Sequence, residues 1–244
     1  MIIKNELTIG SWITLGHPAI AEIMANAGFD WLAIDLEHSV ITIREAEELI
    51  RVIDLSGVIP LVRLTSNSSD LIKRVMDAGA HGVIVPMINT PKEAEMAVRS
   101  VKYPPLGERG IGLARAQKYG PGFDSYINWQ ESTVVIVQIE HIDAVSSFRE
   151  ILSVPGIDGF IIGPYDLSAS MGIPGEFSNP KFITIMDEIK KTANEMNALG
   201  GVHIIEPDPE ELKERISDGY KFIAYSLDIR MLDQTCRLGL EGIK

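Results

Sequence analysis

The most regular feature of this sequence is a short unit in which a helical segment ends on a glycine, one or two polar residues follow, and an apolar run begins. The unit occurs in "NAGFDWLAID", "DAGAHGVIVP", "VPGIDGFIIG" and "SDGYKFIAYS". Glycine just past a helix end is typical of a left-handed terminator, and a short apolar run is typical of a strand buried on both faces. The pattern therefore predicts parallel strands that alternate with helices.

Apolar runs of this kind predict eight strands. Their ranges are 8–14, 31–35, 60–64, 82–86, 134–140, 159–163, 201–204 and 222–226. Apolar positions at helical spacing lie between them, as at Ala46, Leu49 and Ile53. Eight alternating strand–helix units predict a (β/α)8 barrel that spans residues 1–244 as one domain.

Residues 103–132 interrupt this rhythm. The segment "YPPLGERGIGLARAQKYGPGFDSYINWQES" is rich in glycine and proline and has no clear period. A long excursion inside a compact domain is usually functional, and a disordered insertion is the alternative. The alternation of strands and helices resumes afterwards, so the segment is not a domain boundary.

The composition is that of a globular protein, with 45% hydrophobic and 23% charged residues. The net charge of −12 and the lack of a basic cluster argue against nucleic acid as a partner. The N-terminus does not resemble a signal peptide, and no apolar run reaches the roughly 18 residues of a membrane helix. The single cysteine, Cys236, excludes an internal disulfide. We therefore expect a cytoplasmic protein with no membrane partner.

Polar residues are most informative where an apolar run ends, because the active site of such a barrel is built at the carboxyl ends of its strands. Asp166 follows the apolar run of "GFIIGPYDLSAS" in this way. The other residues of this kind are Asp35, Glu37, His38, Arg63, Gln138 and Glu140. We expect these side chains to converge at one end of the barrel.

Glu140 and Asp166 are candidate ligands for a divalent cation, because a hard cation such as Mg²⁺ takes one or two carboxylates and keeps several waters. The alternative is that each acid pairs with a lysine or caps a helix. Arg63 needs an anionic partner, which is either a substrate or a structural salt bridge. His38 is either an acid–base group tuned by a carboxylate or a histidine that is merely hydrogen-bonded.

Two other kinds of site are excluded. No histidine has the spacing of a zinc motif such as H-E-x-x-H. The glycines of "GERGIGLARA" neither follow a strand nor have an acidic partner at the distance that a dinucleotide site requires.

Motifs along nearly the whole chain resemble one known family. "DLEHS", "VRL", "DAGAHGVIVPMINT", "YPPLGERGIGLARA", "VQIE" and "GPYDLSASMG" occur in this order. Together they resemble the HpcH/HpaI family of metal-dependent pyruvate aldolases, whose type member is 2,4-dihydroxyhept-2-ene-1,7-dioate aldolase. The resemblance implies a (β/α)8 barrel of the phosphoenolpyruvate/pyruvate type.

The resemblance also implies a divalent metal ion, with Mg²⁺ or Mn²⁺ expected before Co²⁺ or Zn²⁺. The metal glutamate is the last residue of "VQIE", which is Glu140, and the metal aspartate of "GPYDLS" is Asp166.

Other functional residues of the family fall on matching positions of this chain. The histidine and the nearby acid of "DLEHS" are His38 and Asp35, and the arginine of the third strand is Arg63. The glutamine two positions before the metal glutamate is Gln138. The aspartate that supports the histidine is Asp77 of "DAG".

The substrate is expected to be bordered by Gly163, Pro164, Tyr165 and His203. Two of these depart from the family pattern, because a small residue is common at the position of Tyr165 and an aliphatic residue at that of His203. The aldehyde partner of the type member is therefore not assumed for this chain.

We predict a class II aldolase that reversibly cleaves a 4-hydroxy-2-oxoacid into pyruvate, or a close 2-oxoacid, and an aldehyde. One alternative is a CoA-ester lyase of the citramalyl or malyl type, although the chain lacks obvious room for a CoA-binding extension. The other is a non-catalytic protein that binds a 2-oxoacid.

The C-terminal helix is expected to begin near Asp228 and to carry Met231, Leu232 and Cys236 as an apolar stripe that something must cover. The family exchanges this helix between subunits, in dimers and often hexamers. We therefore expect a homo-oligomer, at least dimeric, in which residues 103–132 or Asp77 complete the active site of a neighbouring chain.

Overall fold

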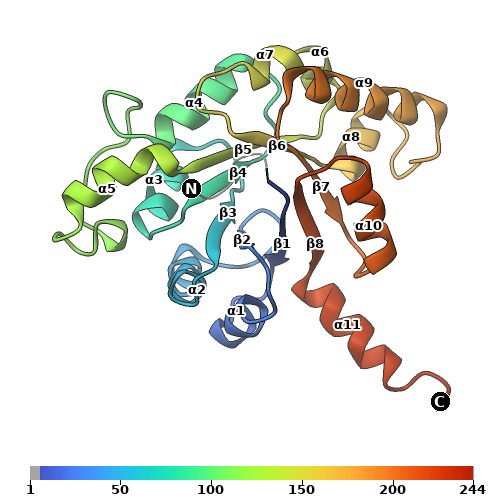
Figure 1. Ribbon diagram of the computed structural model, residues 1–244, viewed down its shortest axis with the longest axis horizontal. Helices are drawn as coiled ribbons and strands as arrows, with labels where there is room; N and C mark the ends of the chain where they lie inside the picture. Colours follow the sequence, from blue (N-terminus) through green and yellow to red (C-terminus); the bar gives the residue numbers. More distant parts are fainter. Residues whose placement is uncertain (1–5, 244) are drawn as a thin grey trace.

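The protein, described here over residues 6–243 of a computed structural model, folds as a closed barrel of parallel strands surrounded by helices (Figure 1). The strands are β1 (Thr8–Ile13), β2 (Trp31–Asp35), β3 (Ile59–Arg63), β4 (Gly82–Val85), β5 (Val134–Ile139), β6 (Gly159–Ile162), β7 (Gly200–Ile204) and β8 (Phe222–Leu227). They pair in chain order, and β8 closes the barrel on β1. The predicted (β/α)8 barrel is confirmed, and each strand begins and ends within one residue of its prediction.

Helices follow the strands, and all but the last lie around the outside of the barrel (Figure 1). They are α1 (Pro18–Ala25), α2 (Ile43–Leu55), α3 (Ser69–Asp77), α4 (Pro91–Val101), α5 (Phe123–Trp129), α6 (Ile142–Ser146), α7 (Phe148–Leu152), α8 (Pro164–Ser170), α9 (Pro180–Met196), α10 (Pro209–Ser217) and α11 (Asp228–Leu238). In α2 the predicted apolar stripe of Ala46, Leu49 and Ile53 is buried. Its first turn is held by a capping box, in which Thr42 and Glu45 bond each other's backbone.

Alternate residues of each strand point into the barrel, as the two-residue period of a strand requires. Trp31, Ala33 and Leu61 belong to the buried apolar cluster inside the barrel. Two residues further along their strands, Asp35 and Arg63 lie on the same inward face and are paired in register. The apolar interior therefore gives way to charged side chains at the carboxyl ends of the strands.

Residues 103–132 form an ordered segment at the opposite, amino end of the barrel. They connect the end of α4 to the start of β5 and contain α5 and two short turns of 3-10 helix, Arg115–Gln117 and Gln130–Ser132. Buried Lys102 donates to the carbonyls of Gln130 and Thr133, at 2.9 Å each. These bonds fix both ends of the excursion, so the alternative of a disordered insertion is wrong.

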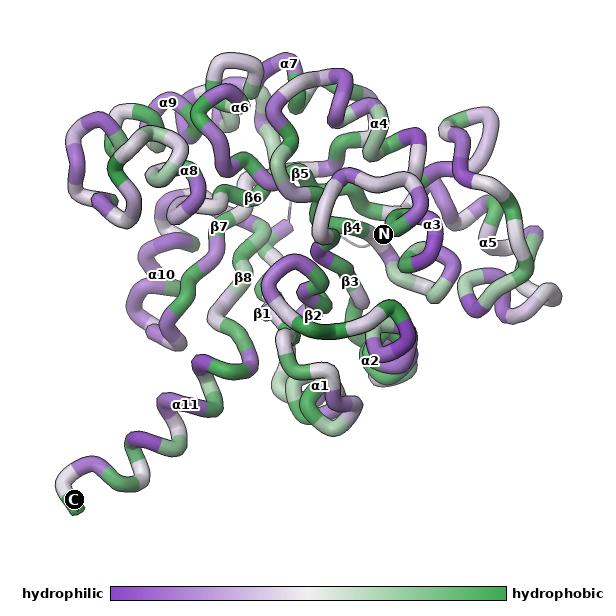
Figure 2. Tube along the Cα trace, turned by 180° about the vertical axis from the view of Figure 1, so that it is seen from behind, coloured by the Kyte–Doolittle hydropathy of each residue, from purple (hydrophilic) through white to green (hydrophobic). Residues whose placement is uncertain are grey.

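The last helix, α11, extends away from the barrel body rather than covering it (Figure 1). It begins at Asp228, as predicted, and Figure 2 shows hydrophobic and hydrophilic residues alternating along it. Met231 contacts the barrel core, whereas Leu232 is 53% and Leu238 67% exposed. The helix thus leaves much of its apolar stripe uncovered in a single chain. Within residues 6–243, no helix has the length and apolarity needed to span a membrane.

Candidate active site at the carboxyl end of the barrel

A cleft of about 400 Å³ opens where the strands end. Nine of its lining residues were predicted from the sequence, namely Asp35, His38, Arg63, Gln138, Gly163, Pro164, Tyr165, Asp166 and His203. Five of the strands, β2, β3, β5, β6 and β7, or the segments that follow them supply these residues, which is how a barrel gathers distant positions into one site. The predicted convergence of polar strand ends is thus present in the geometry.

Arg63 makes a two-pronged ion pair at the bottom of this cleft. Its Nε donates to Oδ1 of Asp35 at 2.9 Å and its Nη2 to Oδ2 at 2.6 Å. The guanidinium also lies over the ring of Trp12, 4.4 Å from its centre. Only 14% of the Arg63 side chain and 2% of that of Asp35 are exposed. Of the two anionic partners considered for Arg63, a substrate and a structural salt bridge, the salt bridge is therefore present. Arg63 also lines the cleft.

Glu140, the first residue after β5, is held from two sides. Its Oε1 accepts from the backbone N–H of Met87 at 2.6 Å, and its Oε2 accepts from the Nε2 of Gln138. Gly163 allows this arrangement, because a Cβ at that position would lie 2.9 Å from Cβ and 3.0 Å from Oε2 of Glu140. The carboxylate is therefore fixed in direction before any ligand binds.

Negative charge exceeds positive charge around Arg63. Four acids, Asp35, Glu37, Glu140 and Asp166, interact electrostatically with one another or with this single arginine. Burial raises the pKa of Glu140, and the charge of Asp166 adds to the effect. Like charges in a low-dielectric site raise one another's pKa unless a cation compensates them.

This donor set fits a divalent metal ion. Glu140 and Asp166 supply oxygen ligands, and hard cations such as Mg²⁺ and Mn²⁺ prefer oxygen. No group of three or more His, Cys, Asp or Glu side chains within residues 6–243 has metal-binding geometry. A metal here would therefore complete its coordination with water and substrate, as catalytic Mg²⁺ does.

Glu37 carries the largest pKa shift among these acids. Burial raises its pKa from 4.5 to about 7, opposed by Arg63 and reinforced by Glu140, Asp35 and Asp166. Its Oε2 is buried without a hydrogen-bond partner.

We therefore expect the metal-free protein to lose stability as the pH rises from about 5 to 8. In this window folded Glu37 keeps a proton that the unfolded chain releases, so the free energy of unfolding falls by ~3 kcal/mol in total. Urea unfolding in chelator at several pH values measures this slope. The Glu37→Gln variant should show a flatter profile, and an identical slope in both proteins would contradict the assignment.

His38 occupies the rim of the cleft. Its side chain is 63% exposed, and its Nε2 lies 3.9 Å from Oε2 of Glu37. Its backbone N–H donates to Oδ1 of Asp35 at 3.3 Å. The imidazole is therefore free to reach a substrate, while the backbone beneath it is fixed.

His203 and Tyr165 form the side of the cleft toward β6 and β7. His203 lies edge-on to Trp12, with ring centres 5.6 Å apart, and burial lowers its pKa to about 4. It is therefore neutral at physiological pH. Tyr165 is 54% exposed and packs edge-on against Phe177, with ring centres 4.9 Å apart.

Several buried polar atoms of this site lack hydrogen-bond partners. They are Nε1 of Trp12, Oε2 of Glu37, Oε1 of Gln138 and Nε2 of His203. Buried polar groups are normally satisfied, and unsatisfied ones call for a ligand, ion or water. Three of the four residues, Trp12, Gln138 and His203, line the cleft, which is consistent with a site for a polar ligand or for water.

Comparison with known proteins agrees with the geometry. A profile of the family described as HpcH/HpaI aldolase/citrate lyase matches residues 8–234. The chain belongs to this family.

Members of the HpcH/HpaI family are similar to this chain over nearly their whole length. The hydroxypyruvate/pyruvate aldolase of Sagittula stellata is 38% identical, over 93% of this chain and 90% of its own. The 2-keto-3-deoxy-L-rhamnonate aldolase of Escherichia coli is 34% identical, over 98% and 91%. An HpcH/HpaI family protein from Burkholderia cenocepacia superimposes with a TM-score of 0.92 at 31% identity, over 99% and 96%. These relatives support a carbon–carbon lyase of the aldolase type.

Asp77 is the one predicted site residue of this HpcH/HpaI chain that lies elsewhere. It ends α3 at the amino end of the barrel and pairs with Arg109, whose Nη1 lies 3.3 Å from its Oδ1. Within one chain it therefore cannot contact His38, and a role for it in the active site requires a second chain.

Sequence reasoning named Glu37 among the converging strand-end residues but did not predict the rise in its pKa, and it did not single out Trp12, which contacts both Arg63 and His203. The two-residue period of "TIGSW" could have placed Trp12 inside the barrel. It also missed the role of Asp228, which accepts from the backbone N–H groups of Thr14 and Leu15 at 2.8 Å each. These two hydrogen bonds join segments near opposite ends of the chain, so no local sequence pattern predicts them.

Proposed function

We propose that this protein is a class II aldolase that reversibly cleaves a 4-hydroxy-2-oxoacid into pyruvate, or a close 2-oxoacid, and an aldehyde. The observation that carries the proposal is the excess of carboxylates around Arg63, whose side chain is only 14% exposed, at the carboxyl end of the barrel. Family membership adds the reaction class, because the curated relatives are named aldolases.

A divalent cation held by Glu140 and Asp166 would supply Lewis-acid stabilisation of the negative charge that develops on the 2-oxoacid. Mg²⁺ or Mn²⁺ suits the two carboxylates better than Co²⁺ or Zn²⁺, which favour softer ligands. Gln138 and Met87 hold the Glu140 carboxylate in place for this role.

Arg63 would donate hydrogen bonds to the 2-keto oxygen, where charge accumulates when the bond between carbons 3 and 4 breaks. Its fixed pairing with Asp35 means that little reorganisation is needed at that moment. His38 would take the proton of the 4-hydroxyl group as the aldehyde forms, and the electron pair of the broken bond would remain on the oxoacid fragment. Protonation at carbon 3 then yields the 2-oxoacid.

Retroaldol cleavage can be followed as release of pyruvate from a 4-hydroxy-2-oxoacid. We expect activity that is abolished by excess chelator and restored by Mg²⁺ or Mn²⁺. Full activity in chelator would refute the proposal, as would irreversible inactivation by borohydride plus substrate, which traps a lysine imine. A parallel assay with CoA esters distinguishes a lyase of the citramalyl type.

Tyr165 and His203 are proposed to contact the aldehyde, because both present a ring to the cleft. We expect Tyr165→Ala to change the ratio of kcat/KM between a short and a branched aldehyde by roughly tenfold, as one or two buried methylene groups do. Pyruvate proton exchange without aldehyde should stay as in the unmodified protein. An unchanged aldehyde ratio would remove Tyr165 from the acceptor site.

We further propose that α11 packs on a second copy of the chain. Its uncovered apolar residues, with Ile229 42% and Leu232 53% exposed, need an apolar partner. In such an assembly Asp77 and residues 103–132 of one chain would approach the cleft of the next. Sedimentation of an active species near 26.8 kDa, the mass of one chain, would contradict this proposal.

A further inference from the structure

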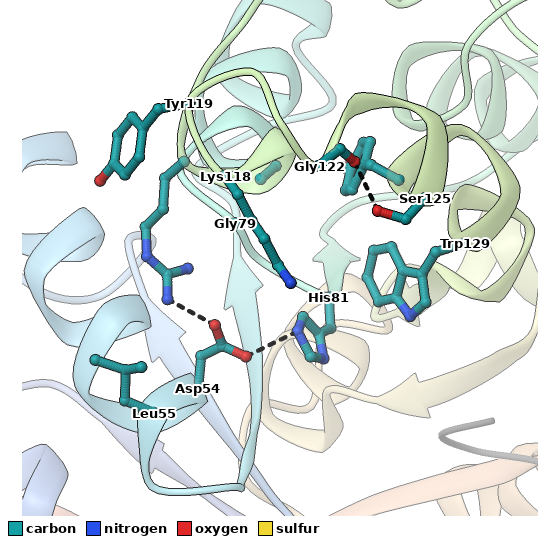
Figure 3. Close-up of a pocket in the computed structure, with 12 residues that line it drawn as sticks. Asp54, Leu55, Gly79, His81, Lys118, Tyr119, Gly122, Ser125 and Trp129 are labelled. Atoms are coloured by element: carbon teal, nitrogen blue, oxygen red, sulfur yellow. Dashed lines mark hydrogen bonds and ion pairs between the residues drawn. The ribbon is translucent and has the colours of Figure 1, made fainter.

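A second cavity, of about 520 Å³, lies at the amino end of the barrel, opposite the active-site cleft (Figure 3). It is bordered by the end of α2, the turn that precedes β4, and residues 115–129. All three elements lie just before strands, which places them at the amino end of a parallel barrel. Its volume is in the range of small-molecule sites, about 300–1,000 Å³. Within one chain, it shares no lining residue with the active-site cleft.

Permanent positive charge exceeds negative charge in this cavity. Oδ1 of Asp54 lies 3.2 Å from Nε2 of His81, and its Oδ2 lies 2.6 Å from Nη2 of Arg115. Lys118 points into the cavity and has no ion pair with any residue in the described part of the chain (Figure 3). One carboxylate thus faces two cations, in a protein whose net charge is −12. A local positive potential on an acidic protein selects anions.

Apolar and aromatic groups form the rest of the wall. Trp129 packs edge-on against His81, with ring centres 4.9 Å apart. Leu55 and Tyr119 also line the cavity and are 79% and 67% exposed. Nδ1 of His81 is buried without a hydrogen-bond partner. The wall therefore offers a surface for the body of a ligand beside the charges for its head.

The backbone around these charges adopts unfavourable conformations. Lys118 and Tyr119 have φ values of 51° and 59°, which side chains other than glycine's disfavour. At Gly79, a Cβ would lie 2.3 Å from Nη1 of Arg115, so only glycine allows this position of the arginine. Strained conformations of this kind concentrate where a ligand is held.

We propose that this cavity binds a small organic anion, whose carboxylate or phosphate group meets Lys118 and Arg115 and whose aromatic or apolar body lies against Trp129. The geometry separates the two parts of the ligand. The head lies among the charges of Lys118 and Arg115, and the body extends toward Trp129 (Figure 3).

Fluorine NMR of the protein labelled with 5-fluorotryptophan tests this proposal directly. The chain has three tryptophans. Trp129 lines this cavity, Trp12 lines the active-site cleft, and Trp31 is stacked on Phe222 inside the barrel. Assignment follows from Trp129→Phe. We expect titration with benzoate or with phenyl phosphate to shift the Trp129 resonance saturably and to leave that of Trp31 unchanged.

Lys118→Glu should weaken this binding by about tenfold or more, because it turns an attraction into a repulsion at close range. Lys191→Glu, at an exposed position of α9, is the matched control and should bind as the unmodified protein does. If circular dichroism shows that Lys118→Glu does not fold, the same binding experiment is done with Lys118→Gln.

Three results would each overturn the proposal. The first is a Trp129 resonance that neither probe shifts, or a response confined to Trp12. The second is equal binding by the Lys118 and Lys191 variants. The third is an affinity for inorganic phosphate equal to that for phenyl phosphate, because the apolar wall would then contribute nothing to binding. Benzoate and phenyl phosphate together tell whether a carboxylate or a phosphate head is preferred.

Discussion

Replacing Glu140 with glutamine is expected to lower kcat/KM for retroaldol cleavage by roughly 1,000-fold, the upper range for loss of one group that stabilises developing charge. Glutamine keeps the shape of the side chain and can still accept from the backbone N–H of Met87. What it removes is one of the two negative charges proposed to hold the metal. Steady-state kinetics over a wide range of Mg²⁺ concentrations measures the loss, part of which excess metal should recover.

Glu210→Gln is the control for this variant, because Glu210 lies exposed on α10, pairs with Lys213 and does not line the cleft. It should match the unmodified protein in both kcat/KM and Mg²⁺ dependence. A Glu140→Gln enzyme with the kinetics of the Glu210→Gln control would show that Glu140 holds no catalytic metal.

Arg63→Lys is expected to lower kcat by roughly 100-fold, because lysine keeps the charge but cannot donate in the paired geometry of a guanidinium. The buried Asp35 would retain a positive neighbour, so the variant should fold. The loss should appear in kcat rather than in KM, since the developing charge exists only in the transition state. Rapid measurement of a single turnover separates this effect from slow product release.

Arg99→Lys makes the same substitution in an exposed ion pair with Glu108 and should leave kcat unchanged. Full kcat in Arg63→Lys would mean that the arginine serves only the salt bridge to Asp35. The structural interpretation of that pair would then be sufficient, and another group would have to stabilise the oxoacid.

The barrel could be predicted from the sequence because its signal is local and repeated. Several strands are short apolar runs that begin after a glycine, as at Gly79 before β4 and Gly156 before β6, and both have positive φ values. Strand-end residues such as Asp35, Arg63 and Glu140 could be named as site candidates for the same reason. Their position in the chain alone specifies which end of the barrel they occupy.

Contacts between distant segments could not be predicted in this way. The position of Glu37 after a strand predicts that it lies near Arg63, but nothing near it in the chain shows how far it is buried, and its pKa depends on that burial. The amino-end cavity depends on Asp54, His81 and Arg115, which meet only in the folded barrel. Residues 103–132 have no apolar period because side chains such as Arg109 and Gln130 anchor them through polar contacts.

The course of α11 illustrates a second limit. The apolar stripe of Met231 and Leu232 predicts that the helix is covered, yet the sequence does not specify by what. In the structure Asp228 fixes the start of the helix against Thr14, and the helix then leaves the barrel. Covering the stripe therefore depends on a partner that the sequence of one chain does not reveal.

The most direct test of the central proposal is exchange of the methyl protons of pyruvate in heavy water, followed by NMR without any aldehyde. The proposed site should generate the enolate from pyruvate alone, so deuterium should enter the methyl group when Mg²⁺ or Mn²⁺ is present. Chelator and the Glu140→Gln substitution should each stop the exchange. Exchange that continues unchanged in chelator, or pyruvate and metal that bind with no exchange at all, would contradict a metal-dependent aldolase.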